Sequence, residues 1–160
     1  MHLMLDIGYY LIFTLYVFKA HTNAETVVRP LFFEFPLDSN TYFIESTFLW
    51  GSCLYIVPIL EPNTNKVTAY FPAGSWYNFV DSKLAFNSTG QSETLTIDDD
   101  KIGLYVRGGG ILPTYKSSAM TTHDLRKQKY YINAYLDNSG KASGEFYHDD
   151  GKSLDTVFLN

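Results

Sequence analysis

From Pro62 onward, short runs of strand-forming residues alternate with turn residues. Turn segments such as Pro72-Ala73-Gly74 and Asn87-Ser88-Thr89-Gly90 separate the runs, and no helical period survives between them. This part of the chain is therefore predicted to be all-β and sandwich-like. The expected strands span residues 66–71, 76–80, 93–97 and 102–106.

Two further strands are expected near the end of the chain, at residues 130–136 and 144–148. They flank Asp137-Asn138-Ser139-Gly140, a composition typical of a hairpin turn. A polar connector, residues 116–129, precedes them.

The part before residue 60 has a different pattern. Residues 1–22 are expected to form a helix that is apolar nearly all round and stops at Asn23. Residues 29–36, RPLFFEFP, form an apolar run bounded by prolines, which is typical of a strand buried on both faces in a parallel sheet. One helix and one buried strand cannot form a domain. The pattern therefore indicates the end of a larger α/β unit, with β-structure after it.

Residues 9–18, YYLIFTLYVF, form a marked hydrophobic stretch. The stretch is about half the ~20 residues that a membrane-spanning helix requires, so no membrane span is predicted. The core of a signal peptide is the alternative to a buried helix, although no Lys or Arg precedes the stretch.

Composition excludes some classes of protein and favours others. The net charge is −5 and the 12 Lys and Arg residues are scattered, which argues against nucleic-acid binding. Aromatic residues make up 17% of the chain, which favours a β-rich core. Cys53 is the single cysteine, so an internal disulfide and a cysteine zinc site are excluded, and a buried, inert thiol is expected.

Several acidic and glycine-rich motifs could suggest a binding site. Asp98-Asp99-Asp100 is expected to be a solvated loop, and His148-Asp149-Asp150 a tight turn, because further metal ligands at suitable spacing are lacking. Gly108-Gly109-Gly110 precedes Ile111-Leu112-Pro113, which argues against the helix that a phosphate loop needs, so a bulge or tight turn is expected.

Two further motifs concern sugars. Trp76, Tyr77 and Phe79 could form an exposed sugar platform, although packing between sheets is the stronger interpretation. Asn87-Ser88-Thr89 is an N-glycosylation sequon on an expected loop, to be used only if the chain enters the secretory pathway.

Collinear segments across nearly the whole chain resemble family 31 glycoside hydrolases, the α-glucosidases of the maltase, glucoamylase and sucrase-isomaltase type. The first two resemble the last barrel helix and strand and the exit from the barrel. The others resemble the first β-domain, its final strands and the start of a second β-domain. They are YYLIFTLYVFKAHTNAETVVRPLFFEFP, FLWGSCLYIVPILEP, VTAYFPAGSWYNF, IGLYVRGGGILP and GEFYHDDGKSLDT.

The resemblance implies a remnant of a (β/α)8 barrel at 1–59, a proximal β-domain at 60–124 and the start of a distal β-domain at 125–160. It also favours the helix interpretation of residues 9–18 over a signal peptide. The family retains anomeric configuration through two aspartates, which lie in Trp-x-Asp-Met-Asn-Glu and Gly-Asp-Asn motifs. Neither motif occurs in this chain, so no catalytic, substrate-binding or metal-binding residue and no cofactor is assigned to it.

The chain alone is accordingly expected to be inactive, as a C-terminal portion of a parent enzyme that hydrolyses terminal α-glucosyl linkages. Its partners would be carbohydrate, through the parent, and the missing catalytic barrel. Two alternatives remain open: a carbohydrate-binding β-module, or an interaction subunit that completes a barrel supplied by another chain. Relatives in the family are commonly lysosomal, extracellular or in the secretory pathway.

Overall fold

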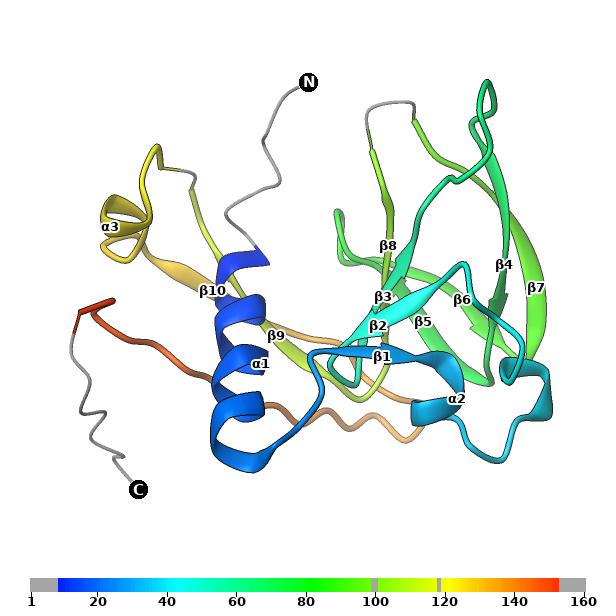
Figure 1. Ribbon diagram of the computed structural model, residues 1–160, viewed down its shortest axis with the longest axis horizontal. Coiled ribbons are helices and arrows are strands. Elements are labelled where there is room, and N and C mark those ends of the chain that lie inside the picture. Colours follow the sequence, from blue (N-terminus) through cyan, green and yellow to red (C-terminus); the bar gives the residue numbers. More distant parts are fainter. Residues whose placement is uncertain (1–8, 99–100, 118, 153–160) are drawn as a thin grey trace.

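The computed structural model describes residues 9–98, 101–117 and 119–152. Within them the chain is mainly β-sheet with a few short helices, as the sequence predicts (Figure 1). The elements are α1 (Tyr10–Asn23), β1 (Val28–Pro30), α2 (Leu31–Glu34), η2 (Ser39–Thr41), β2 (Phe48–Trp50), β3 (Leu54–Val57), β4 (Lys66–Phe71), β5 (Gly74–Asn78), β6 (Leu84–Ser88), β7 (Gln91–Thr96), β8 (Gly103–Arg107), β9 (Ile111–Tyr115), α3 (Thr122–Leu125) and β10 (Tyr130–Ala134).

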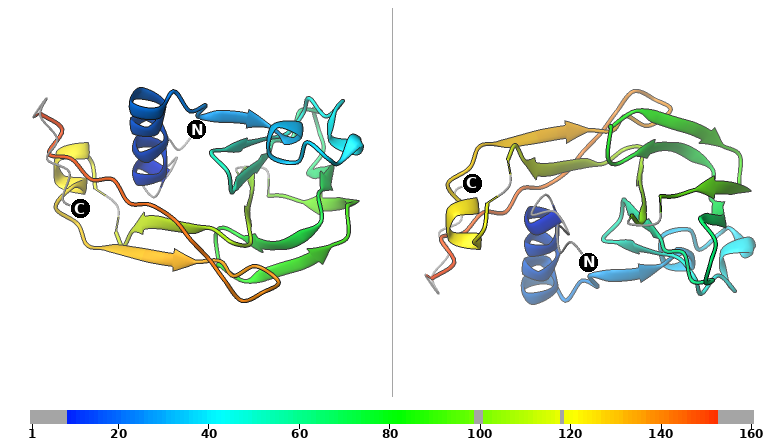
Figure 2. Two further views of the ribbon diagram at one scale, coloured as in Figure 1. Left: turned by 90° about the horizontal axis from the view of Figure 1, so that it is seen from below. Right: turned by 90° about the horizontal axis from the view of Figure 1, so that it is seen from above.

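The largest sheet has six strands in the order β1-β2-β3-β8-β5-β6, and its neighbouring strands are antiparallel. The pairs β4–β7 and β9–β10 form two further two-stranded antiparallel sheets. Figure 2 shows α1, β1 and α2 along one side of the molecule and the strands β9, β10, β5 and β6 along the opposite side. The space between these two layers holds the core.

Apolar side chains form two main clusters, and β3 contributes to both because successive side chains of a strand point to opposite faces. One cluster joins α1 to the sheet and contains Ile12, Tyr16, Cys53, Leu54, Val106, Leu112 and Tyr135. The other contains Leu31, Leu49, Tyr55, Val57, Ala69, Phe71 and Trp76. In the second, the Phe71 ring meets those of Tyr55 and Trp76 edge-on, with centroids 5.2 and 5.3 Å away.

Helix α1 ends at Asn23, as expected, and Ala24 follows in the left-handed conformation with φ 55°. The expected start at residue 1 lies outside the described residues, and α1 begins at Tyr10. Leu11, Ile12 and Leu15 are buried, so the hydrophobic stretch packs against the sheet. Among the described helices, none has the length and apolarity needed to cross a membrane.

The prediction of a buried strand over residues 29–36 is wrong beyond Pro30. Pairing stops at Pro30, which has no N–H to donate to a ladder, and residues 31–34 form the one-turn helix α2 instead. The Phe35 N–H donates to the Leu31 carbonyl at 2.9 Å. β1 is also the edge strand of an antiparallel sheet, where a strand of a parallel sheet was expected. Only Leu31 of α2 is buried, whereas Phe32 and Phe33 remain exposed.

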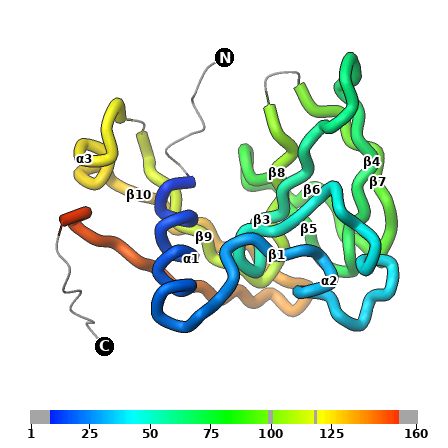
Figure 3. The backbone as a smooth tube through the Cα atoms, in the orientation of Figure 1, coloured from blue at the N-terminus to red at the C-terminus, as the bar shows by residue number. Residues whose placement is uncertain are grey.

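Three local predictions in the β-region also need correction. The expected strand 144–148 does not pair with another described strand. A single bridge joins Ser143 to Gly110 just before it, and the Tyr147 ring then stacks on that of Phe18 in α1, with centroids 4.1 Å apart. Figure 3 shows this segment running back past α1. The polar connector contains the short helix α3. Asn87 lies in β6, where a loop was expected, because Phe86 packs edge-on against Phe71 and so orders the strand.

The domain boundaries after residues 59 and 124 stay predictions. Strand pairing runs across both positions: β3 pairs with β8 over the first, and β9 pairs with β10 over the second.

We predict that Tyr55→Phe lowers the free energy of unfolding by about 2 kcal/mol, since it leaves buried polar groups unpaired. The fully buried Tyr55 hydroxyl donates to the Tyr70 carbonyl at 2.9 Å and lies 2.8 Å from Thr47 Oγ1. Burial raises the pKa of this hydroxyl to about 12. Urea denaturation followed by tryptophan fluorescence measures the change.

Tyr105→Phe is the matched control, because Tyr105 lies opposite Tyr55 in the β3–β8 register and burial alone raises the pKa of its hydroxyl. If Tyr105→Phe lost as much stability as Tyr55→Phe, the contacts of the Tyr55 hydroxyl with Tyr70 and Thr47 would not be the cause of the loss.

Candidate functional site

The acidic residues that the structure describes form no metal site. Asp98 pairs with Lys101 at 2.6 Å, and the hydrogen bond from Lys101 lowers the pKa of the Asp98 carboxyl. Asp99 and Asp100 lie outside the described residues. Asp149 accepts hydrogen bonds from the Gly151 amide at 3.0 Å and from Arg126 at 3.2 Å, as expected of a tight turn. The described residues contain no cluster of His, Cys, Asp and Glu that could hold a metal.

The glycine run is a tight turn between β8 and β9, as expected. Gly109 has φ +101°, which favours glycine. A β-carbon on Gly110 would lie 2.9 Å from Cys53 Sγ, so only glycine allows this close approach. A strand follows the glycines, so the helix N-terminus of a phosphate-binding loop is absent here.

The two adjacent aromatic residues of β5 pack on opposite faces of the sheet. Trp76 is fully buried and its indole N–H donates to the Pro72 carbonyl at 2.8 Å, so it belongs to the core, as predicted. Tyr77 packs with Tyr135 in the other cluster, at 5.4 Å between centroids. Cys53 is buried, and burial raises the pKa of its thiol. These aromatic side chains therefore offer no exposed sugar platform.

A charged cluster that sequence reasoning missed lies between α2 and β8. The Glu34 carboxylate accepts a hydrogen bond from Arg29 Nη1 at 2.6 Å, and Arg107 Nη1 lies 3.6 Å from its other oxygen. Arg29 also pairs with Glu25 at 3.0 Å. Burial disfavours the charge on Arg29, but the hydrogen bonds and charges of Glu34 and Glu25 outweigh it and raise its pKa.

This cluster is more than a surface ion pair. The side chains of Arg29 and Glu34 are only 12% and 13% exposed, and the Arg107 guanidinium lies 4.3 Å over the Phe35 ring. Through its two guanidinium partners, the Glu34 carboxylate joins α2 to β1 and to β8.

The segment from α1 to Phe43 carries many exposed apolar side chains, and Figure 2 shows that its first elements form one outer layer. The exposed fractions are 55% for Phe33, 99% for Leu37 and 91% for Phe43. We call this set the apolar face; it comprises Phe13, Val17, Val28, Phe32, Phe33, Leu37 and Phe43. Large apolar side chains are thus often exposed along this segment, as is typical of a surface that another part of a protein covers.

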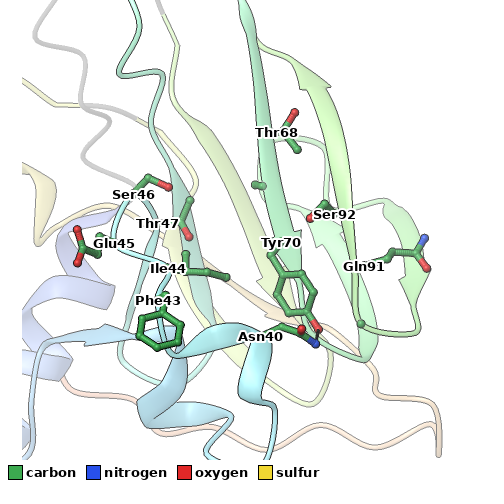
Figure 4. A pocket seen from close by; sticks show the side chains of 12 residues that line it. Asn40, Phe43, Ile44, Glu45, Ser46, Thr47, Thr68, Tyr70, Gln91 and Ser92 are labelled. Carbon is green, nitrogen blue, oxygen red and sulfur yellow. Dashed lines mark hydrogen bonds between the residues drawn. The ribbon is translucent and has the colours of Figure 1, made fainter.

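A groove of about 750 Å³ lies between residues 43–47 and the β4–β7 sheet (Figure 4). Its lining is mostly polar, with the rings of Phe43 and Tyr70 among it. The Tyr70 hydroxyl is held by Asp38 at 2.7 Å and Asn40 at 3.2 Å. These two hydrogen bonds hold the ring in place, and burial, followed by the bond to Asp38, raises the pKa of the Tyr70 hydroxyl.

Known proteins match the chain along most of its length. A model of the glycosyl hydrolase family 31 C-terminal domain matches residues 24–112. The lysosomal alpha-glucosidase of Mus musculus is 40% identical over 153 residues, which covers 85% of this chain and 16% of that protein. The probable maltase-glucoamylase 2 of Homo sapiens is 42% identical over 138 residues, covering 86% of this chain and 5% of that protein.

Solved structures share the fold. The crystal structure of the glucosidase II alpha subunit bound to DNJ matches 91% of this chain and 16% of its own, with a TM-score of 0.85 at 21% identity. A glucose complex of the Flavobacterium johnsoniae GH31 dextranase matches 84% of this chain and 16% of its own, with a TM-score of 0.76 at 22% identity. The chain thus spans about a sixth or less of the length of these proteins.

We expect Glu34→Gln to lower the free energy of unfolding by about 2 kcal/mol, because the largely buried Arg29 and the partly exposed Arg107 would lose their shared counter-charge. Thermal and urea unfolding measure the change. Asp98→Asn is the control: it also removes a carboxylate from an ion pair, but one exposed to solvent, so the midpoint should not move. Equal midpoints for Glu34→Gln and the parent chain would show that the cluster contributes nothing to stability.

Proposed function

The chain belongs to glycosyl hydrolase family 31, and from this we propose that it forms a non-catalytic C-terminal part of a retaining α-glucosidase. In this proposal residues 1–59 are the end of a catalytic (β/α)8 barrel, with α1 as its last helix, and β-domain material follows them. The observation that carries the proposal is the match to α-glucosidases, which covers most of this chain but only a small part of those proteins. The sequence also lacks the two aspartate motifs.

The apolar face supports this assignment. Helix α1 buries Leu11, Ile12 and Leu15 against the sheet, yet Phe13 and Val17 on its other side are 46% and 43% exposed. A helix that is apolar on all sides is stable when both sides are covered. In our proposal the remainder of the catalytic barrel covers the exposed side, and the β-region holds the last barrel elements in place through Glu34 and Arg107.

The role of the chain is then structural. Retaining hydrolysis needs two carboxyl groups about 5 Å apart across the sugar. Glu34 is held by Arg29 and Arg107, and Asp149 is held by Arg126, so neither is poised for that chemistry. The parent enzyme would hydrolyse terminal α-glucosyl linkages with aspartates that the catalytic part supplies.

We predict that the purified chain does not hydrolyse maltose or an aryl α-glucoside. A chimera in which this chain replaces the matching segment of the mouse lysosomal alpha-glucosidase should hydrolyse both, because the missing aspartates are then supplied. Release of glucose and of the aryl group measures turnover. Phe33→Asp in the chimera should reduce activity at least tenfold by placing a charge on the apolar face, whereas Glu93→Gln on strand β7 should not.

Turnover by the chain alone that survives purification and disappears on mutation of one of its aspartates would contradict the proposal. An active chimera that tolerates Phe33→Asp would leave the family assignment intact but refute the covering of the apolar face.

A second candidate function is carbohydrate binding in the groove of Figure 4. The specific observation is Phe43, which is 91% exposed at the groove and lies there with Tyr70 and a mostly polar lining. An aromatic ring can stack on the C–H face of a sugar while hydroxyl and amide groups bind its hydroxyls, and the groove has the volume of a ligand site.

If the groove binds sugar, maltotriose should shift amide resonances of residues 43–47 and of β4 in an isotope-labelled chain. Phe43→Ala should weaken binding at least fivefold through loss of the stacking surface. Phe33→Ala is the control, since Phe33 is also exposed but lies outside the groove lining. Unchanged spectra at 10 mM maltotriose, or equal effects of the two substitutions, would exclude the site.

A further inference from the structure

Strand β6 forms one edge of the six-stranded sheet. It pairs with β5, and among the described residues no strand pairs with its other side. Edge strands usually carry charged residues or proline that discourage pairing with another chain. The β6 sequence, LAFNS, contains neither, and Leu84 is 50% exposed. A register shift opposite Trp76 and Tyr77 interrupts the pairing with β5, but β6 carries no charged residue or proline of its own to protect the edge.

The N-glycosylation sequon lies at the end of this strand. Asn87 is exposed. Its Oδ1 lies 2.9 Å from Ser75 Oγ on the neighbouring strand and shares the single proton of that hydroxyl with Asn138 Oδ1, which lies at 2.5 Å. Within the described part of the chain its Nδ2, the atom to which a glycan would be attached, makes no hydrogen bond. Thr89, which completes the sequon, is exposed in the turn that follows.

The surroundings of the sequon are firmly held. Ser88 is buried, its hydroxyl donates to the Phe71 carbonyl, and it accepts a hydrogen bond from the Gly90 amide at 3.0 Å. The buried side chain thus anchors the strand end, while Asn87 and Thr89 on either side of it remain exposed. A large hydrophilic substituent on Asn87 would fit without displacing a packed side chain.

We propose that Asn87 carries an N-linked glycan when the chain passes through the secretory pathway, and that this glycan shields the β6 edge. The donor is an oligosaccharide linked to a lipid diphosphate. Nδ2 forms a bond to the anomeric carbon of the first sugar as the bond from that carbon to the diphosphate oxygen breaks. The lipid diphosphate leaves, and Nδ2 loses one of its two protons. The hydrated glycan then occupies the space that a second β-strand would need.

The test expresses the chain behind a signal peptide in a secretory host. Asn87→Gln removes the acceptor, and Thr89→Ala removes the sequon while retaining Asn87 and its bond to Ser75. The mass of each protein is measured before and after treatment with peptide N-glycosidase. We expect a loss of mass for the parent chain and none for either variant. An unmodified parent chain overturns the proposal.

The shielding role is tested by light scattering on the purified, untreated proteins over a range of concentrations. Both unglycosylated variants should form at least threefold more multimer than the glycosylated chain. Asn87→Lys, which also lacks the glycan, should return the multimer fraction toward that of the parent chain, since a charge on the edge serves the same purpose. Because all variants share the apolar face, multimers formed through it do not depend on residue 87. Equal multimer fractions for all proteins overturn the shielding role.

Discussion

The position of β3 in the middle of the largest sheet is the constraint on which the rest of the structure depends. β3 pairs with β2 from earlier in the chain and with β8 from much later, and Leu54, Tyr55 and Val57 are fully buried. Leu54 belongs to the apolar cluster that includes α1, and Tyr55 and Val57 belong to the cluster that includes Trp76 of β5. Both clusters therefore pack against the same strand. Removing β3 would separate the two layers and open both cores.

A few polar contacts fix how the first segment sits on this framework. Glu34 links α2 to Arg107 at the end of β8, and the Tyr55 hydroxyl links β3 to the Tyr70 carbonyl of β4. These buried contacts lie on the inner side of the first segment, while its outer side exposes Phe33, Leu37 and Phe43. The first segment thus has an inner side that is bonded to the β-region and an outer side that no other described part of the chain covers. In the function proposed above, the outer side is the one against which the catalytic barrel packs.

Part of the site could be predicted from sequence because it depends on local chemistry. The glycine run before Pro113 indicated a turn without a phosphate-binding helix, and Trp76 within a strand of aromatic residues indicated core packing. The Glu34 cluster could not be predicted, because Arg107 is far from Glu34 in sequence and reaches it only through the β3–β8 pairing. The groove also depends on a contact at long range, between residues 43–47 and the β4–β7 sheet.

The sequence by itself determined the β-rich character beyond Pro62, the helix that stops at Asn23, the turns and the family, because these follow from local propensity and from collinear motifs. Only the tertiary structure decided which strands are neighbours, that residues 31–34 turn into a helix after Pro30, and that Asn87 lies on a sheet edge. The physical reason is that strand pairing and burial are made by residues distant in sequence. The same apolar run, RPLFFEFP, can be a buried strand or an exposed helical turn according to what lies against it.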